Sequence, residues 1–361
     1  MSTDVYERLA QTLDALPNGF PRTASGIELE ILRKIYTEEE AELTSKLKLM
    51  PETASEIAER LGRDAAATAR LLEEMREHGC MGAIGPPERR RYHLQPFVIG
   101  VLEYQLPRVD RETAELMEQY AREGFFAGIG SNEPAFLQTV PVERSIQAGL
   151  EIHPYESVRE LMDKAVAFYT IDCICRTEQA LLGKPCGKPI SNCITMSMNE
   201  HAFDHSFRGR AVDREEAEKI MREAAEAGLV HSTMNVTGET YHFCNCCPCC
   251  CGLLRGLIEF EAPNLIARSN FWAAIDPDTC QACGVCADER CPVEAISEAD
   301  DCYLVDRERC LGCGVCSITC PTESITMVRK PEEQCVRAPK NMIEWMIKRS
   351  EDTGKPLDRF L

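Results

Sequence analysis

Cysteine is the residue whose number and spacing could do chemistry in this sequence. The chain of 361 residues has 21 cysteines, and twenty of them lie between residues 170 and 335. Many follow one another at spacings of one to three residues, and cysteines that close rarely pair with one another as disulfides. Reduced thiolates crowded in this way are typical metal ligands. Iron–sulfur clusters are the leading candidate for what they hold.

The C-terminal third repeats one cysteine motif. The segment from Cys280 to Pro292 has the pattern C-x2-C-x2-C-x4-C-P, and the segment from Cys310 to Pro321 has C-x2-C-x2-C-x3-C-P, at an offset of 30 residues. A cubane needs four thiolates, and a loop with a cysteine at every third position can wrap three of its corners. A pair of zinc sites is the alternative, because C-x2-C is also a zinc motif. Eight cysteines in two such runs, each ending in Cys-Pro, favour iron–sulfur clusters.

These two motifs resemble those of the bacterial two-cluster ferredoxins. The resemblance implies two [4Fe–4S] clusters, each taking its fourth ligand from the opposite half. The implied ligand sets are Cys280, Cys283, Cys286 and Cys320 for the first cluster, and Cys310, Cys313, Cys316 and Cys291 for the second. The first half departs from the family pattern by one extra residue in the segment 287–290. We expect this residue to bulge outward without the loss of the Cys291 ligand.

A second cysteine-rich region precedes the repeat. Its ten cysteines are Cys173, Cys175, Cys186, Cys193, Cys244, Cys246, Cys247, Cys249, Cys250 and Cys251. We interpret the first four as one ligand group, and a subset of the 244–251 run as a second group or as part of a larger cluster. One or two further iron–sulfur clusters are therefore predicted here. A single structural zinc ion with spare cysteines is the alternative.

The layout of the whole chain is similar to that of a group of poorly characterised bacterial and archaeal 4Fe–4S proteins. The shared features are a helix-turn-helix-like N-terminus, a CxCR segment (residues 173–176), a GLVH…N segment (residues 228–235), the CNCCxCCC run (residues 244–251) and a terminal dicluster domain. The similarity implies an electron-transfer or oxidoreductase-accessory role. Arg176 follows the CxC and could donate a hydrogen bond to a cluster sulfur; an ordinary surface arginine is the alternative.

The elements that must position these cysteines predict an α+β fold. Helices are expected at 56–61 and 64–78, each ended by a glycine, and a hairpin follows at 81–92. This pattern resembles a winged helix-turn-helix module over residues 26–105. Further helices are expected at 110–122, 155–167 and 213–227, with a strand at 168–172. The expected domains are a helical winged-helix-like domain (1–105), a helical connector (106–165), a mixed α/β cysteine-rich domain (166–268), a ferredoxin-like dicluster domain with a pseudo-twofold repeat (269–330) and a helical tail (331–361).

The charge balance limits the partners. Forty Lys and Arg residues against 59 Asp and Glu give a net charge of −19. Such a surface argues against nucleic acid and favours redox proteins with basic docking surfaces. The sequence has no apolar run of 18 residues and no apolar segment near its N-terminus. We therefore expect a cytoplasmic protein without a membrane span.

Three functions follow from these observations. The first is a multi-cluster protein that relays single electrons between a donor and a redox enzyme, with a place in anaerobic metabolism. An electron-transfer subunit or accessory protein is favoured over a stand-alone enzyme, and no catalytic residue is assigned. The second is an oxidoreductase with its own substrate-binding cluster in the 173–251 region. The third is an iron–sulfur redox-sensing transcription regulator, against which Glu73, Glu74 and Glu77 stand in the candidate recognition helix.

Overall fold

The structure is a computed structural model that describes residues 4–147, 149–206 and 208–360. The chain forms two compact units. Unit 1 contains residues 1–129, 177–185 and 346–361, and unit 2 contains residues 130–176 and 186–345. Helices α10 (Ile174–Leu181) and α13 (Met342–Thr353) begin in unit 2 and end in unit 1. The two units are described separately below.

Unit 1 is mostly helical. Its helices are α1 (Val5–Asp14), α2 (Ile27–Ile35), α3 (Glu38–Thr44), α4 (Ala54–Leu61), α5 (Ala65–His78), α6 (Leu102–Tyr104), α7 (Arg111–Arg122) and α8 (Phe125–Gly130), with short helical turns η1 (Pro87–Arg89), η2 (Phe97–Val101) and η8 (Asp358–Phe360). The helices predicted at 56–61, 64–78 and 110–122 are confirmed. The Asp64 side chain accepts from the Ala67 amide at the start of α5, and Gly79 (φ 75°) ends that helix.

A small sheet accompanies α4 and α5. The predicted hairpin is present as β2 (Gly82–Ile84) and β3 (Arg91–His93), which pair antiparallel. A third strand, β1 (Glu52–Thr53), pairs with the other edge of β3. The sequence analysis did not anticipate β1, because two residues are too few to show an alternating pattern. The likeness of this arrangement to a winged helix stays a prediction.

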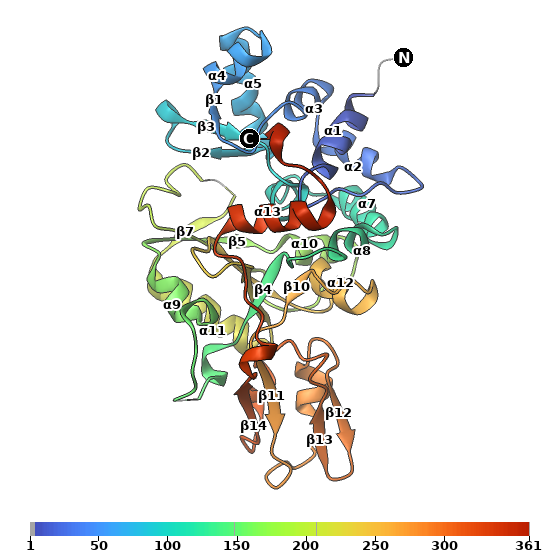
Figure 1. Cartoon of the computed structure of the whole chain (residues 1–361), viewed down its shortest axis with the longest axis vertical. Helices are drawn as coiled ribbons and strands as arrows, with labels where there is room; N and C mark the ends of the chain where they lie inside the picture. The colour runs from blue at the N-terminus through green and yellow to red at the C-terminus, as the bar shows by residue number, and fades with distance from the viewer. Residues whose placement is uncertain (1–3, 148, 207, 361) are drawn as a thin grey trace. The chain divides into compact units, whose positions relative to one another are not determined.

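Unit 2 is built on a seven-stranded sheet (Figure 1). The strand order is β10-β4-β8-β9-β6-β5-β7, and all pairs are antiparallel except β10 with β4. The strands are β4 (Leu137–Val140), β5 (Ala167–Asp172), β6 (Ser191–Ser197), β7 (Arg210–Val212), β8 (Val230–Met234), β9 (His242–Cys246) and β10 (Ile266–Ala267). The strand predicted at 168–172 is therefore confirmed as β5. Three of these strands lead directly into or contain the cysteines of the middle region.

Helices pack on this sheet and form its core. They are α9 (Val158–Asp163), α11 (Arg214–Glu226) and α12 (Gly252–Glu259), with short turns η3 (Glu143–Ser145) and η4 (Pro154–Glu156). Ile220 and Met221 of α11 join Phe168, Ile194 and Phe243 of the sheet in one buried apolar cluster. The helix predicted at 213–227 is confirmed as α11. The one predicted at 155–167 is shorter than expected, since Ser157 caps it and β5 begins at Ala167.

The C-terminal repeat folds as two exchanged ribbons within unit 2. Strand β11 (Phe271–Ile275) pairs with β14 (Ile325–Arg329), and β12 (Ile296–Ala299) pairs with β13 (Cys302–Val305). The strand that precedes the cysteine loop of each half thus pairs with the strand that follows the loop of the other half. Short helical turns η5 (Cys286–Arg290), η6 (Ser317–Thr319) and η7 (Glu332–Gln334) complete this region. Figure 1 shows the four strands gathered in the orange and red part of the chain.

The helices were compared with the requirements for spanning a membrane. Of the residues that the structure describes, no helix combines the length and the apolar character needed to cross a bilayer.

Candidate metal centres

Two hollows in the C-terminal repeat bring together the cysteines of its two motifs. Cys280, Cys283, Cys286 and Cys320 line one hollow. Cys291, Cys310, Cys313 and Cys316 line a second hollow. Each hollow therefore takes three cysteines from one half of the repeat and the fourth from the other. We call these the outer and the inner cysteine set, respectively.

An aspartate begins each cysteine loop. The Asp276 carboxylate accepts from the Asp278 amide (3.0 Å) and the Thr279 hydroxyl (3.0 Å), and its carbonyl accepts from the Cys280 amide (3.1 Å). In the other half, the Asp306 carboxylate accepts from the Glu308 amide (2.9 Å), and its carbonyl accepts from the Cys310 amide (2.9 Å). These turns aim the first cysteine of each loop. The sequence analysis did not assign them a role, although an aspartate recurs at the same position of both halves.

The extra residue of the first half is taken up by a change in the type of helical turn. Residues 286–290 form a π-helical turn, and the Cys291 amide donates to the Cys286 carbonyl (3.0 Å). The second half has a tighter 3-10 turn at the same place, with the Cys320 amide donating to the Ser317 carbonyl (3.3 Å). A π turn has room for one more residue. Cys291 consequently still reaches the inner set.

The turn also carries a contact that its shorter counterpart does not. Arg290, the last residue of η5, donates a hydrogen bond from its guanidinium to the Glu226 carbonyl (2.8 Å) at the end of α11. A cation at a helix C-terminus meets carbonyls without intrahelical partners and the negative end of the helix dipole. Arg290 therefore ties the repeat to a helix that packs on the sheet.

The two sets differ in their access to solvent. Cys310, Cys313 and Cys316 of the inner set are buried, and the Val142 amide donates to the Cys313 carbonyl (3.0 Å). In the outer set Cys283 is exposed, and Cys280 and Cys320 are half-buried. Burial raises the pKa of the Cys313 thiol to about 12. Burial also opposes ionisation of Cys320, but hydroxyls of Ser324 and Thr322 outweigh it and lower the pKa of that thiol to about 7.

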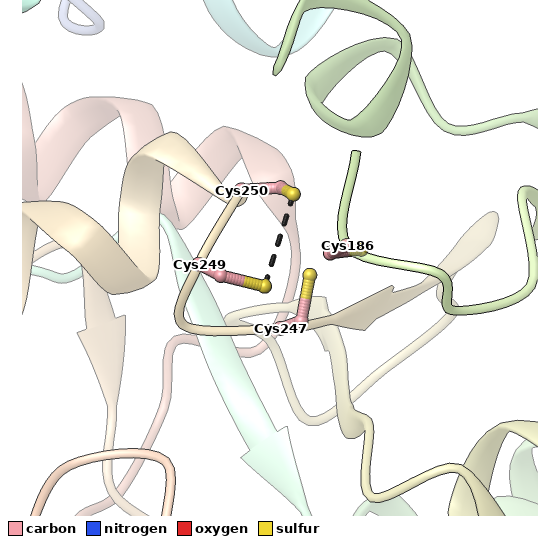
Figure 2. A group of neighbouring side chains, drawn as sticks. All are labelled: Cys186, Cys247, Cys249 and Cys250. Carbon is pink, nitrogen blue, oxygen red and sulfur yellow. Dashed lines mark hydrogen bonds between the residues drawn. The ribbon is translucent and has the colours of Figure 1, made fainter. Parts of the chain in front are cut away.

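The middle region contains a compact group that we call the four-cysteine site, which consists of Cys186, Cys247, Cys249 and Cys250. The four sulfur atoms all lie within 4.8 Å of one another, and the Sγ atoms of Cys249 and Cys250 are 3.8 Å apart. Figure 2 shows Cys247, Cys249 and Cys250 on a tight turn and Cys186 on a separate segment opposite them. Cys247 and Cys250 pack with Ala224 and Leu229 in a small apolar cluster.

The other six cysteines form a closed chain of sulfur contacts, which we call the six-cysteine ring. Hydrogen bonds link Cys173 to Cys175 and Cys193, Cys251 to Cys175 and Cys246, and Cys244 to Cys193 and Cys246. Cys246 and Cys251 are buried, and the remaining four are partly buried. Thiols donating to Cys173 lower its pKa well below the usual range, and those donating to Cys251 do the same there. Each of these two sulfurs is thus stabilised as a thiolate by two neighbours.

Strand register explains this division of the cysteines. Cys244 and Cys246 stand two residues apart on β9 and so lie on one face of the sheet. Because Ile194 of β6 pairs with Phe243 of β9, the antiparallel register brings Cys193 next to Cys244. Cys247 comes directly after the strand ends and belongs to the turn.

The predicted grouping of Cys173, Cys175, Cys186 and Cys193 is therefore wrong in one member. Cys186 lies with Cys247, Cys249 and Cys250 in the four-cysteine site, whereas the other three belong to the six-cysteine ring. Proximity in the sequence suggested the first grouping. The sheet separates Cys186 from its sequence neighbours, because Cys193 is carried by β6 and Cys186 by the segment before that strand.

Arg176 lies between the two groups of the middle region. Its side chain is only 4% exposed, which excludes the surface arginine of the sequence analysis. The guanidinium donates to the Asn192 side-chain oxygen (2.9 Å) and to the Asn245 carbonyl (2.7 Å), and both acceptors are neutral. Burial works to lower the pKa of Arg176, but the negative charges of Cys173, Cys247, Cys193 and Cys246 together raise it. A buried positive charge thus faces sulfur from both groups.

The asparagine that holds Arg176 is itself fixed by a buried network. The Asn245 side chain donates to the Asn192 carbonyl (2.5 Å), and its oxygen lies 2.5 Å from Nδ1 of His231. Burial lowers the pKa of His231 to about 4, so the imidazole is neutral at neutral pH.

Three cysteines stand apart from every group: Cys80 is buried with its sulfur 3.8 Å from the Ile35 carbonyl, and Cys302 and Cys335 are partly buried.

Comparison with known proteins identifies one region. Residues 303–326 match the model of the 4Fe-4S binding domain family, and this span includes Cys310, Cys313, Cys316 and Cys320. No curated protein and no solved structure matches the chain. The matched span carries three cysteines of the inner set and one of the outer set. All-cysteine donor sets around separate hollows fit [4Fe–4S] clusters, so the chain has an iron–sulfur domain at its C-terminal end.

Proposed function

We propose that this protein is a multi-cluster iron–sulfur electron-transfer protein that relays single electrons between a donor and a redox enzyme. The observation that carries the proposal is the composition of the two hollows, each with three cysteines from one half of the repeat and one from the other. The match of residues 303–326 to the 4Fe-4S binding domain supports the same function. The outer set would hold one [4Fe–4S] cluster and the inner set a second, and such clusters supply one-electron chemistry.

Exposure suggests which end of the repeat meets a partner. Cys283 is exposed, whereas the three cysteines of the inner set on the second loop are buried. A partner can therefore approach the outer set closely and is kept away from the inner one. Burial also lowers the local dielectric around the inner set, which changes the potential of a bound cluster. The repeat thus has an accessible and a protected redox site.

The six-cysteine ring supports a further cluster in the middle region. Its six sulfurs exceed the four corners of one cubane, so we infer a larger cluster or a cubane with two spare thiols. Arg176 would place a positive charge beside it, within reach of Cys173, Cys193 and Cys246. Positive charge stabilises an added electron and so raises the reduction potential. The ring would then be a favourable destination for electrons from the repeat.

The net charge supports docking to basic redox partners. The chain carries −19, and two four-thiolate clusters in their oxidised state would add about −4. Electrostatic steering by such a surface makes the association rate fall as salt rises. Stopped-flow electron transfer at low and high ionic strength tests this part of the proposal. A rate that does not respond to salt contradicts steering by charge.

Unit 1 favours a partner other than DNA. Glu73 of α5 accepts hydrogen bonds from Arg76 (3.0 Å) and Arg90 (2.7 Å), and Arg91 of the hairpin lies 3.5 Å from Glu56. Three of the arginines that could contact phosphates are thus engaged with carboxylates. A gel shift with genomic DNA fragments tests this, and salt-sensitive binding at submicromolar protein would favour the regulator function instead.

The central experiment is a metal and sulfide count on protein purified without air. We expect about eight iron and eight sulfide ions per chain from the repeat, more if the ring is filled, and loss of visible absorbance on adding dithionite. The Cys302→Ser variant is a matched control because Cys302 lies outside both sets. Colourless protein with zinc in place of iron overturns the proposal.

A further inference from the structure

We propose that the four-cysteine site binds one tetrahedral thiophilic metal ion, Zn²⁺ or mononuclear iron, and not an iron–sulfur cluster. The inference concerns Cys186, Cys247, Cys249 and Cys250 alone. It does not depend on the electron-transfer role proposed for the repeat. It would divide the ten cysteines of the middle region into a single-ion site and a separate redox site.

The spacing of the sulfur atoms carries this proposal. A Zn–S bond is about 2.3 Å long, so the sulfurs of a tetrahedral four-thiolate site lie about 3.8 Å apart. The sulfur atoms of the four-cysteine site are all within 4.8 Å of one another, and those of Cys249 and Cys250 are 3.8 Å apart. One ion at the centre would be coordinated by all four sulfur atoms after small changes in the side-chain torsion angles.

A cubane needs a wider arrangement. Its four irons and four sulfides stand between the thiolates, so the cysteine sulfurs must lie farther apart than around a single ion. The repeat differs, because the cysteines of each of its sets line a hollow together with apolar side chains from both halves. The sulfurs of the four-cysteine site converge on one point instead (Figure 2).

The surroundings fit a closed structural site. Cys247, Cys249 and Cys250 come from one turn, which the hydrogen bond from the Cys251 amide to the Cys247 carbonyl (3.0 Å) holds shut. Ala224 and Leu229 pack against Cys247 and Cys250 and exclude water from that side. Four protein ligands leave no open coordination position, as in structural zinc sites. The ion would join the turn that leads into α12 to the distant segment at Cys186.

Charge compensation is also present. Four thiolates around a divalent ion carry a net charge of −2, and a nearby hydrogen-bond donor or cation stabilises such a site. Arg176 is buried, and its charge acts on Cys247. The same arginine also faces the six-cysteine ring. Its positive charge would therefore stabilise negative charge at both centres.

The test is metal analysis of the whole chain purified without air, comparing the native sequence with Cys249→Ser. Cys249 is exposed, so its replacement spares the core. We expect the variant to lose about one metal ion per chain while the cluster iron and the sulfide stay unchanged, and the bleaching by dithionite also stays unchanged where the lost ion is zinc. Cys335→Ser is the matched control and should lose no metal. The metal analysis names the element that is lost. X-ray absorption spectroscopy at the edge of that element, zinc or iron, then identifies the ion.

The outcomes separate clearly. Loss of one zinc ion, with an edge spectrum showing four sulfurs at about 2.3 Å and no neighbouring metal, supports a zinc site. Loss of one iron without sulfide supports mononuclear iron in the same geometry. Loss of about four irons with their sulfide overturns the proposal, and so does an unchanged metal content. Because total sulfide reports on the proposed clusters and not on a single-ion site, failure here leaves the electron-transfer proposal intact, and colourless protein that contains zinc defeats only the latter.

Discussion

The C-terminal repeat and the middle region are both dense in cysteine, but they organise it in different ways. In the repeat, each set takes three cysteines from one short loop, and the sulfurs surround a hollow. In the middle region, the six-cysteine ring draws on strands and loops that are distant in the sequence, and the four-cysteine site joins one turn to a distant segment, with its sulfurs close to one another. One short loop or turn thus supplies three ligands in the repeat and in the four-cysteine site, so dense local spacing alone does not fix a set. In the middle region, the register of the sheet decides which cysteines of the 244–251 run belong to which group.

The strongest test of the contrast is the exchange of ligands in the repeat. Cys291 belongs to the first half of the sequence but lines the inner hollow with cysteines of the second half. We expect Cys291→Ala to remove about four irons, that is, the cluster of the second loop, and to leave the cluster of the first loop in place. Iron analysis with electron paramagnetic resonance of the reduced protein measures this. Retention of all iron, or loss of the first-loop cluster, contradicts the exchange.

A second prediction separates the two groups of the middle region. If Cys186 and Cys193 shared one centre, their serine variants would have the same metal content. The structure predicts different contents: Cys193→Ser should lose several irons from the ring, and Cys186→Ser should lose a single ion. Parallel zinc, iron and sulfide measurements on the two variants check this. Equal losses would restore the grouping suggested by the sequence.

The third prediction concerns the positive charge beside the ring. Replacing Arg176 by Met keeps much of the side-chain volume but removes the charge that faces Cys173 and Cys193. We expect the midpoint potential of a middle-region cluster to fall by roughly 50 to 90 mV, which corresponds to about 1–2 kcal/mol. Redox titration followed by electron paramagnetic resonance is the measurement. Arg144→Met, at an exposed arginine with a side chain 64% accessible, should leave every potential unchanged.

The smallest expected effect concerns Arg290, at the end of the longer turn of the first half. Arg290→Ala removes the hydrogen bond to the Glu226 carbonyl at the end of α11. A partly exposed bond of this kind contributes about 1 kcal/mol to stability, so the free energy of unfolding should fall by that amount. Denaturant unfolding of the anaerobic protein measures it, with Arg268→Ala, at an exposed arginine of the same unit, as the control. If Arg290→Ala left the free energy of unfolding and the iron content unchanged, the hydrogen bond between the repeat and α11 would not contribute to stability.

The sequence contained enough information for the elements with strong local signals. Asp64, Gly79, Asp213 and Gly228 mark helix ends, and the structure has α5 and α11 at those positions. The repeated motif marked the eight cysteines of the repeat, and the resemblance to two-cluster ferredoxins implied the two sets that line the hollows. The four-cysteine site could not be predicted, because it depends on where β9 ends and on the pairing of β6 with β9. The burial of Arg176 depends on the same long-range pairing, so its place between two sulfur groups left no local signal.

The exchange of strands and ligands between the halves of the repeat has a consequence for biosynthesis. Cys320 completes the outer set, and the β14 strand that pairs with β11 lies beyond it. Neither hollow can be closed while only the first half of the repeat has left the ribosome. Loading of the clusters proposed for the repeat must therefore wait until both halves have been synthesised, and a message truncated between the two halves would yield a polypeptide in which neither cysteine set is complete.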